Sequence, residues 1–250
     1  MALVFVPGGP LNGITGKAGS LPRLHATGAN DWDKAPAWCT DFWFTPAIDL
    51  NTASSPGLLS AQGWLAAGTI SFVAGTGADF LSSADPGVIA HMLLDATGER
   101  LTSPFIFGQD WKTRYIRDQL GWQPKKLIAD FTAIWTTASN ADTTGGIGFV
   151  EAGGAIQTAA DHLAMLTSDG TNFILRSGAA TSDFAGAVTL TSARWRIELN
   201  LTSQLAILYK NGSLFDSIAL EADLFPCAFG AACTSSNDLG LGDAHVYYSD

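Results

Sequence analysis

The chain has 250 residues, of which 47% are hydrophobic and only 14% are charged, which suffices for a buried core and excludes a disordered protein. The formal net charge is −10. Most of it lies in residues 127–250, where four Lys and Arg face thirteen Asp and Glu. Because so acidic a half would repel a phosphate backbone, we expect no nucleic-acid partner.

The first 36 residues are predicted to form an extended arm or a long loop. Residues 7–36 are rich in Gly, Pro, Asn and Ala and show little hydrophobic periodicity. An arm without a core of its own is often ordered only by a neighbouring subunit. The apolar residues 1–6 lack a basic segment and are too few for a signal peptide, and no stretch reaches the length of a membrane span. We therefore expect a protein made in the cytoplasm without export.

Residues 37–250 are predicted to form one all-β domain. Glu and Lys, which favour helix surfaces, are scarce, whereas the 27 Gly and 10 Pro suit tight turns. The one helix expected covers residues 110–120, where Asp110 can cap the first turn and Gly121 follows the last. Strands are predicted, in chain order, at 38–50, 65–72, 88–94, 127–135, 146–151, 163–166, 173–175, 194–201, 205–215 (as a hairpin) and 245–248.

Residues 194–201 and 205–215 carry the clearest sheet signature. Polar and apolar residues alternate along the first segment, so Trp195 and the apolar residues after it share one face of a strand. In the second segment, Asn211-Gly212 tolerates the positive φ that a type I′ turn requires at both central positions. Together the two segments predict three consecutive antiparallel strands.

The turns also predict which residues face each other. A two-residue turn at Asn211-Gly212 places Tyr209 opposite Leu214, Leu205 opposite Ile218 and Leu208 opposite Phe215. Both faces of this hairpin then carry apolar side chains, which predicts a cover over each, from the second sheet and from a loop, a helix or a neighbouring chain. A second turn, at Asp169-Gly170, places Met165 opposite Ile174 and Leu166 opposite Phe173.

These C-terminal features resemble the concanavalin A-like lectin/glucanase superfamily, which includes laminin-G-like and pentraxin-like jelly rolls. In that superfamily a strand opened by Trp, here Trp195, precedes a hairpin of the form apolar-x-Tyr-x-Asn-Gly, here residues 207–212. A closing strand follows a Gly-rich loop, here residues 239–243. The resemblance covers residues 125–250, the best-supported part of the domain, and implies a two-sheet antiparallel β-sandwich. It implies no activity, because this fold serves lectins, hydrolases, lyases and structural domains.

Catalytic patterns are scarce, so we expect a protein without enzymatic activity and with no catalytic residue. Glucanases of this superfamily hold two Glu on one strand, but none of the four Glu here has another within five positions. A lyase-like site would need a Tyr/His pair together with Arg or Gln; His245 with Tyr247 is the only local pair, and an ordinary strand also explains it. No nucleophile motif or phosphate loop is present.

Asn140, Asp142, Asn237 and Asp238 are the candidate ligand-binding residues. Sugars present hydroxyl groups on one side and C–H faces on the other, so lectin sites pair Asp or Asn with aromatic rings, and the chain has eight Trp. The alternative is that the Trp residues form core and the Asp and Asn form turns. No Asp-x-Asp-x-Asp-Gly loop is present. We expect no cofactor, and the sequence places no metal, although calcium stays open.

The cysteines are Cys39, Cys227 and Cys233, an odd number that does not fit a disulfide framework. Three buried thiols are expected, and a small bridge between Cys227 and Cys233 is the alternative in an oxidising compartment. No Cys-x-x-Cys motif supports a zinc site.

The first functional hypothesis is a non-enzymatic structural protein of a virus particle. The arm, the Ala/Gly/Thr/Ser-rich composition and the scarcity of catalytic patterns suit a subunit of a large assembly. Tailed bacteriophages use lectin-like jelly rolls as decoration, fibre or tail components, and the chain resembles them in style. The location is then the virion, and the partners are copies of the chain and other particle subunits, reached through the arm, with surface glycans as a further ligand. The alternatives are a carbohydrate-binding lectin or module, with an extracellular location, and a polysaccharide-degrading hydrolase or lyase.

Overall fold

The structure, a computed structural model, describes thirteen stretches of the chain, and everything below concerns these: residues 22–24, 30–32, 41–44, 65–68, 71–74, 90–94, 96–107, 125–135, 142–182, 186–189, 192–221, 226–234 and 239–249. Most of these residues lie in antiparallel strands. Within them the helical structure is one 3₁₀ turn, η1 (Ala159–Asp161). No helix in these stretches is long and apolar enough to cross a membrane. The predicted all-β class is confirmed.

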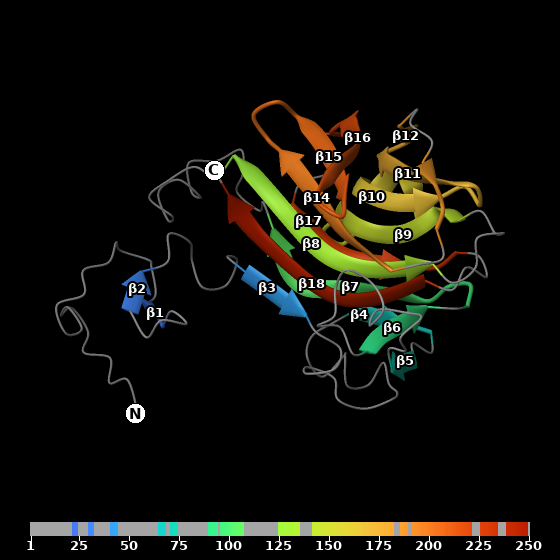
Figure 1. The fold of residues 1–250 in the computed structure, drawn as a ribbon, viewed down its shortest axis with the longest axis horizontal. Coiled ribbons are helices and arrows are strands. Elements are labelled where there is room, and N and C mark those ends of the chain that lie inside the picture. Colours follow the sequence, from blue (N-terminus) through green and yellow to red (C-terminus); the bar gives the residue numbers. More distant parts are fainter. Residues whose placement is uncertain are drawn as a thin grey trace.

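Two eight-stranded sheets form the fold, a two-sheet β-sandwich (Figure 1). The sheet we call the β9 sheet has the order β12 (Ala180–Thr181), β11 (Asn172–Ser177), β10 (His162–Ser168), β9 (Asp142–Glu151), β17 (Cys227–Ala232), β7 (Arg100–Phe107), β4 (Leu65–Ala67), with β13 (Gly186–Ala187) also beside β11. The β8 sheet has the order β16 (Ser213–Ala219), β15 (Leu205–Lys210), β14 (Ala193–Asn200), β8 (Lys126–Trp135), β18 (Leu239–Ser249), β6 (Ala90–Leu94), β5 (Ser71–Ala74), with β3 (Asp41–Phe44) also beside β18.

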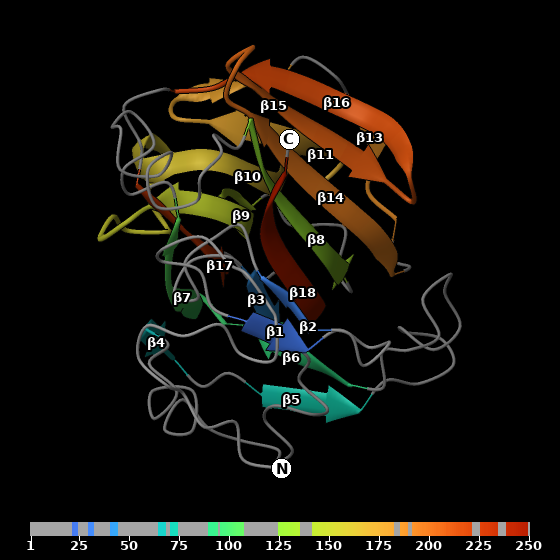
Figure 2. The same cartoon turned by 90° about the vertical axis from the view of Figure 1, so that its left-hand side faces the viewer.

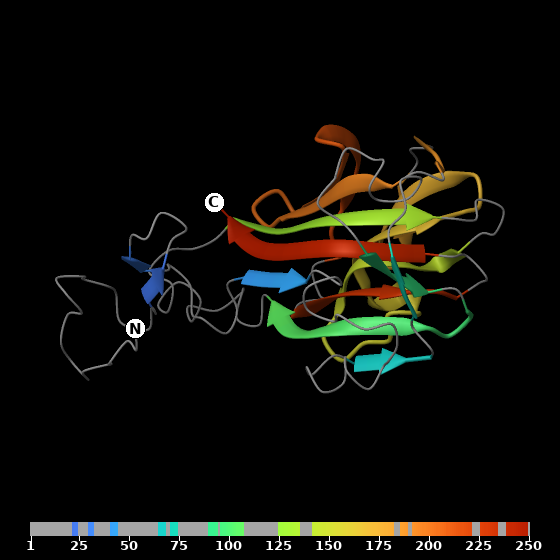
Figure 3. The same ribbon diagram turned by 60° about the horizontal axis from the view of Figure 1, so that its bottom comes forward.

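The main hydrophobic core fills the space between the two sheets. On β14 the predicted alternation is confirmed: Trp195, Ile197 and Leu199 are buried in this core, whereas Arg196 is exposed on the other face. Aromatic rings join the layers, with the Phe131 ring of β8 5.7 Å from the Phe229 ring of β17. Figures 2 and 3 show the two layers from further directions, with β8 and β18 adjacent in each view.

The outer face of the β9 sheet is covered by residues 152–161, a segment we call the strap. Ile156 of the strap is buried in a second cluster with four residues of the sheet, Val150, Met165, Ala228 and Ala232. Several hydrogen bonds hold the strap. Among them, the Asp161 Oδ2 accepts from the Ala155 N–H at 2.7 Å, Gln157 Nε2 donates to the Cys233 carbonyl at 3.2 Å, and His162 Nε2 lies 2.8 Å from the Ile156 carbonyl. Strands β10 and β17 are therefore buried on both faces.

The Asn211-Gly212 turn is confirmed as type I′, because φ is 50° at Asn211 and 80° at Gly212. The predicted pairing of Tyr209 with Leu214 is confirmed. The two other predicted pairs are wrong, because a bulge between Leu208 and Tyr209 shifts the register: Leu208 pairs with Asp216, and Leu205 pairs with Ala219. Leu214 is 67% exposed, so the chain itself does not cover the outer face at this tip. A cover from a neighbouring chain stays a prediction.

The predicted register at Asp169-Gly170 is wrong by two partner positions. Met165 pairs with Arg176 and Leu166 with Leu175, so Gly170 and Thr171 are the central residues. The cause is the Asp169 side chain, whose Oδ1 accepts the N–H groups of Thr171 at 2.8 Å and Asn172 at 2.6 Å and so closes the turn one residue later. A shift of two keeps each side chain on its predicted face.

Several strand boundaries differ from the prediction. The segment 65–72 forms two strands in different sheets, β4 and β5, and φ of +85° at Gly68 ends the first. Strands β7 and β17 were not predicted. The Gly-rich segment 239–243 is not a loop but the first part of β18, with a register shift between Leu241 and Ala244.

Cys227 and Cys233 are buried and form no disulfide. They lie six positions apart along the extended β17 segment, about 20 Å, which is far beyond disulfide reach. Burial raises the pKa of the Cys227 thiol, which keeps it protonated. The predicted buried thiols are confirmed for these two residues, and Cys39 lies outside the described stretches.

Part of the predicted N-terminal arm forms a small sheet of its own, in which β1 (Pro22–Leu24) pairs with β2 (Asn30–Trp32). The remainder of residues 1–36 and the predicted helix at 110–120 lie outside the described stretches. The division into an arm and one domain stays a prediction.

Candidate binding face

The strand order of the β8 sheet brings polar residues from distant parts of the chain together on its outer face. Strand β8 lies between β14 and β18, and Asp130 is the ladder partner of both Arg196 and His245. Because directly paired residues project to the same face, the three side chains form a row across three strands. Tyr247 is two residues beyond His245 on β18 and therefore shares this face.

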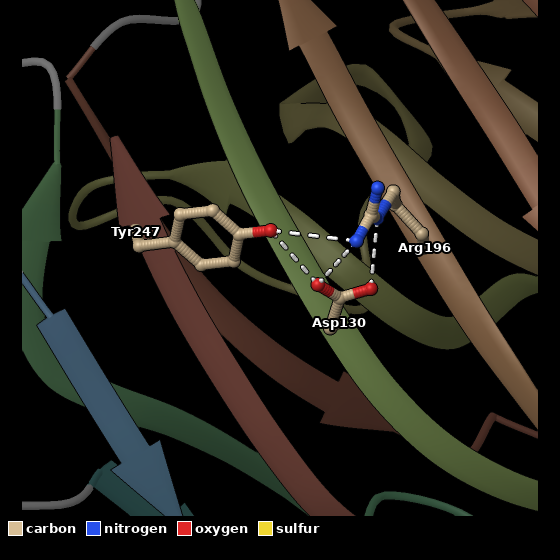
Figure 4. A network of polar contacts seen from close by, with 3 residues as sticks. All are labelled: Asp130, Arg196 and Tyr247. Carbon is tan, nitrogen blue, oxygen red and sulfur yellow. Dashed lines mark hydrogen bonds and ion pairs between the residues drawn. The ribbon is translucent and has the colours of Figure 1, made fainter. Parts of the chain in front are cut away.

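Asp130, Arg196 and Tyr247 form a closed hydrogen-bonded network (Figure 4). Arg196 binds the carboxylate with two bonds, Nε to Oδ1 at 2.9 Å and Nη2 to Oδ2 at 3.0 Å. The Tyr247 hydroxyl donates to Oδ2 at 3.0 Å and lies 3.5 Å from Arg196 Nη2. Such a bidentate pair fixes the planes of both groups.

The network has a mostly buried side, at Asp130, and a solvent-exposed side, at Arg196. The Asp130 side chain is 14% exposed, whereas that of Arg196 is 44% exposed. Its hydrogen bonds to Asp130 raise the pKa of the Arg196 guanidinium. Burial, and next the charge of Asp130, raise the pKa of the Tyr247 hydroxyl. At neutral pH Arg196 is therefore a cation and Tyr247 a neutral hydrogen-bond donor.

Aromatic rings flank the network on both sides. The His245 ring stacks on the Tyr247 ring, with centroids 4.5 Å apart and planes inclined by 26°. On the other side, half-buried Tyr209 of β15 is the ladder partner of Arg196. A second ion pair, Lys126 Nζ to Glu198 Oε1 at 3.0 Å, lies further along the same two strands, β8 and β14. The face thus offers charged groups, hydroxyl groups and ring surfaces side by side.

This arrangement suits the binding of a polyhydroxylated ligand better than acid–base catalysis. The raised pKa of Tyr247 removes it as a base at neutral pH, and the Arg196 charge is already paired with Asp130. Of the four Glu, only Glu198 lies on this face: Glu99 precedes β7, Glu151 ends β9 and Glu221 follows β16. Within the described stretches no three His, Cys, Asp or Glu residues are placed to hold a metal ion.

The four predicted ligand-binding residues are not tested by the structure. Asp142 begins β9, where its backbone pairs with Ser168, but its side chain is not described. Asn140, Asn237 and Asp238 lie outside the described stretches. They stay predictions, separate from the network on the β8 sheet.

The sequence pattern indicated His245 with Tyr247 as a local pair but did not predict Asp130 and Arg196 as site residues. Two features of the sequence point to these residues. Asp130 is the one charged residue within the apolar segment 127–135, and Arg196 occupies a polar position of an alternating strand. Neither signal gave the partner, because Asp130 lies 66 positions from Arg196 and 117 from Tyr247.

No protein-family model matches the sequence, and no curated protein matches it. Among solved structures, similarity extends to a protein of unknown function, SO2946 from Shewanella oneidensis MR-1, with a TM-score of 0.48 and 12% identity over 84% of this chain and 87% of that one. Peanut lectin bound to a 9mer peptide gives a TM-score of 0.49 and 10% identity over 84% and 97%. Alginate lyase AlyC3 gives 0.39 and 10% identity over 62% and 72%. These values are low and the proteins include both a lectin and a lyase, so none assigns an activity to this chain.

Proposed function

We propose that the chain binds glycans on the outer face of the β8 sheet. The observation that carries this proposal is the network of Asp130, Arg196 and Tyr247, which is open to solvent and flanked by rings. A sugar hydroxyl can accept from Arg196 and donate to Asp130, while the C–H face of the ring packs on an aromatic surface. Since the network is already formed without ligand, little ordering cost opposes binding.

Binding is favoured over polysaccharide cleavage by the way in which the charged and phenolic groups of the site are already engaged. A lyase needs a base that removes a proton at working pH, and Tyr247 keeps its proton because burial raises its pKa. A retaining or inverting hydrolase needs one protonated and one ionised carboxyl group on either side of the scissile bond. Here Asp130 and Glu198 are each paired with a cation, Arg196 and Lys126.

The particle hypothesis remains a proposal that rests on the sequence. A sandwich subunit that presents a glycan-binding face would suit the surface of a virus particle, with the virion as its location and the arm as its contact to other subunits. Limited proteolysis tests this role. We expect residues 1–36 to be cleaved in the isolated chain and protected in the assembled particle; equal protection in a lone monomer would contradict it.

Glycan binding is tested on an array of neutral and acidic glycans, followed by titration calorimetry with the best ligand. We expect Arg196→Ala to abolish measurable binding. The matched control is Arg100→Ala, because Arg100 is also exposed and makes a hydrogen bond, to Gln157 Oε1 at 3.1 Å, but lies in the β9 sheet. An array without any hit, with and without calcium, would overturn the proposal. Unsaturated products released from a uronic-acid polysaccharide would instead favour a lyase.

A further inference from the structure

Three aromatic rings from both sheets meet at one end of the sandwich and form the walls of a corner. Phe173 comes from β11, Trp195 from β14 and Phe215 from β16, and Figure 2 shows these strands together at one end. The ring planes are nearly perpendicular in all three pairs: 73° for Phe173–Trp195, 81° for Trp195–Phe215 and 70° for Phe173–Phe215. The centroids are 5.0, 5.4 and 6.4 Å apart in the same order.

The ammonium group of Lys210 occupies this corner. Lys210 is the ladder partner of Trp195, so its side chain projects inward, away from the binding face that carries Arg196. Its Nζ lies 5.0 Å from the Phe173 centroid, 5.2 Å from that of Trp195 and 5.9 Å from that of Phe215. Lys210 Nζ also donates a hydrogen bond to Thr189 Oγ1 at 3.0 Å, and Thr189 lies in the segment between β13 and β14.

The ring geometry of the corner suits an organic cation. An ammonium group within about 6 Å of a ring centroid is attracted by the negative face of the ring, and three faces act together here. Lys210 is half-buried, so its charge is partly removed from water, and this burial lowers its pKa. Within the described stretches Lys210 makes no ion pair, unlike Lys126, which binds Glu198. The rings and one hydroxyl group therefore replace the carboxylate that a half-buried lysine usually has.

We propose that Phe173, Trp195 and Phe215 form an alkylammonium-binding cage that the chain fills with its own Lys210. Filling the cage connects the β15–β16 hairpin of one sheet to β11 of the other, since each sheet supplies part of the walls. This site is independent of the proposed glycan binding, which uses the opposite face of the β8 sheet. If the three rings form such a cage, the cage should select for positive charge as well as for shape.

Thermal unfolding of charge-neutral variants tests the selection for charge. Lys210→Met keeps the length of the side chain but removes the charge, and we expect a loss of about 2–6 °C in the unfolding midpoint. Lys210→Arg keeps the charge and should lose less. The matched control is Lys126→Met, which removes a lysine of similar burial that is paired with a carboxylate. A Lys210→Met variant as stable as the native protein would overturn the proposal.

Chemical rescue tests the cage as a binding site. Lys210→Ala removes the equivalent of a propylammonium group, so n-propylammonium chloride should raise its unfolding midpoint more than sodium chloride or 1-propanol at the same concentration. Lys126→Ala should show no such preference. If Lys210→Ala responds equally to propylammonium and to 1-propanol, the site does not select for charge and the proposal fails.

The native protein offers a test that needs no destabilised variant. The chain has six lysines, so reductive ¹³C-dimethylation gives a sparse NMR spectrum. The Lys210 signal, assigned by its loss in Lys210→Arg, should be shifted upfield by the currents of three rings. A Lys210 signal at the position of exposed lysines would show that the cage is empty and overturn the proposal.

Discussion

The outer faces of the two sheets have opposite characters. On the β9 sheet, Val150, Met165 and Ala228 are apolar and buried under Ile156 of the strap. On the β8 sheet, the corresponding face carries the Asp130 network, in which Arg196 is open to solvent, whereas Ile128 and Ile134 on the same face of β8 are buried. Both sheets contribute apolar residues to the same core, and they differ most clearly outward, where the strap covers one sheet and the Asp130 network lies on the other.

This difference separates stability from binding in one fold. A sheet face that a loop covers holds apolar side chains or polar ones with hydrogen-bond partners, because buried polar groups without partners cost free energy. Strand β17 illustrates how close the cover lies, since a Cβ at Gly230 would come 2.6 Å from Ile156 Cδ1. An exposed face can instead carry charged groups at little cost in free energy, because water still solvates them. The part of the β9 sheet under the strap therefore contributes to stability, and the Asp130 network on the β8 sheet is where the proposed glycan binding would take place.

Ile156→Ala gives the largest expected effect and tests the stabilising role of the covered face. Ile156 is 1% exposed, and truncating such a residue costs about 2–5 kcal/mol of unfolding free energy. Urea unfolding measures this loss. Glycan affinity, measured by calorimetry on the folded fraction, should not change. A stable variant with impaired glycan binding would contradict the separation of the two faces.

Asp130→Ala should have the reverse profile. We expect the affinity for glycans to fall at least about tenfold, equivalent to about 1.4 kcal/mol, because Arg196 and Tyr247 lose the group that orients them. The unfolding free energy should fall by only about 1 kcal/mol, because the Arg196 side chain is 44% exposed and can be solvated.

Asp130→Asn separates charge from shape at the same position. It keeps one acceptor oxygen but removes the negative charge, so it should retain part of the affinity that Asp130→Ala loses. Equal affinity in the native protein and both variants would show that the ligand binds elsewhere.

The strands differ in how far the sequence predicts them. The alternation around Trp195 and the Asn211-Gly212 turn are local, and both are confirmed in β14 to β16. Strand β17 was missed because Cys227–Ala232 consists mainly of Ala, Gly and Cys and lacks the β-branched residues typical of strands. It forms a strand because it is buried between β7 and β9, a tertiary context.

The candidate site depends even more on tertiary context. The alternation of polar and apolar residues along β14 predicts that Arg196 points outward. It does not predict that β8 lies beside β14 and β18 beside β8. Asp130 and Tyr247 meet only because strands 117 positions apart are adjacent in the sheet. Even the register of a local hairpin differs from the prediction at Asp169, because hydrogen bonds to its side chain place the turn one residue later.

Tyr247→Phe gives a smaller effect that depends on pH. Removing the hydroxyl group loses a hydrogen bond to Asp130, worth about 1 kcal/mol. The folded pKa of Tyr247 is raised, so the folded chain holds the phenol proton more tightly than the unfolded chain. Its contribution is therefore complete below the unfolded pKa of about 10 and is lost as the pH rises above that value.

Unfolding free energies of the native protein and Tyr247→Phe, compared between neutral and alkaline pH, measure this contribution. The difference between them should shrink above a pH of about 10. Spectrophotometric titration should show one tyrosine of the native protein, absent in the variant, that ionises at a higher pH than the others. A difference in stability that grows with alkaline pH would contradict the described network.

Leu214→Ser gives the smallest expected effect and tests whether the open face continues to the tip of the hairpin. Leu214 is 67% exposed and pairs with Tyr209, which in turn lies opposite Arg196. In an isolated chain the substitution should change the unfolding free energy by less than about 0.5 kcal/mol, because little apolar contact is lost. If a second copy covers this tip, light scattering should show an oligomer that Leu214→Ser dissociates, with a loss of stability that depends on protein concentration. A monomer in both cases would leave the tip of the hairpin uncovered, and Leu214→Ser would then affect glycan binding less than any change in the Asp130 network.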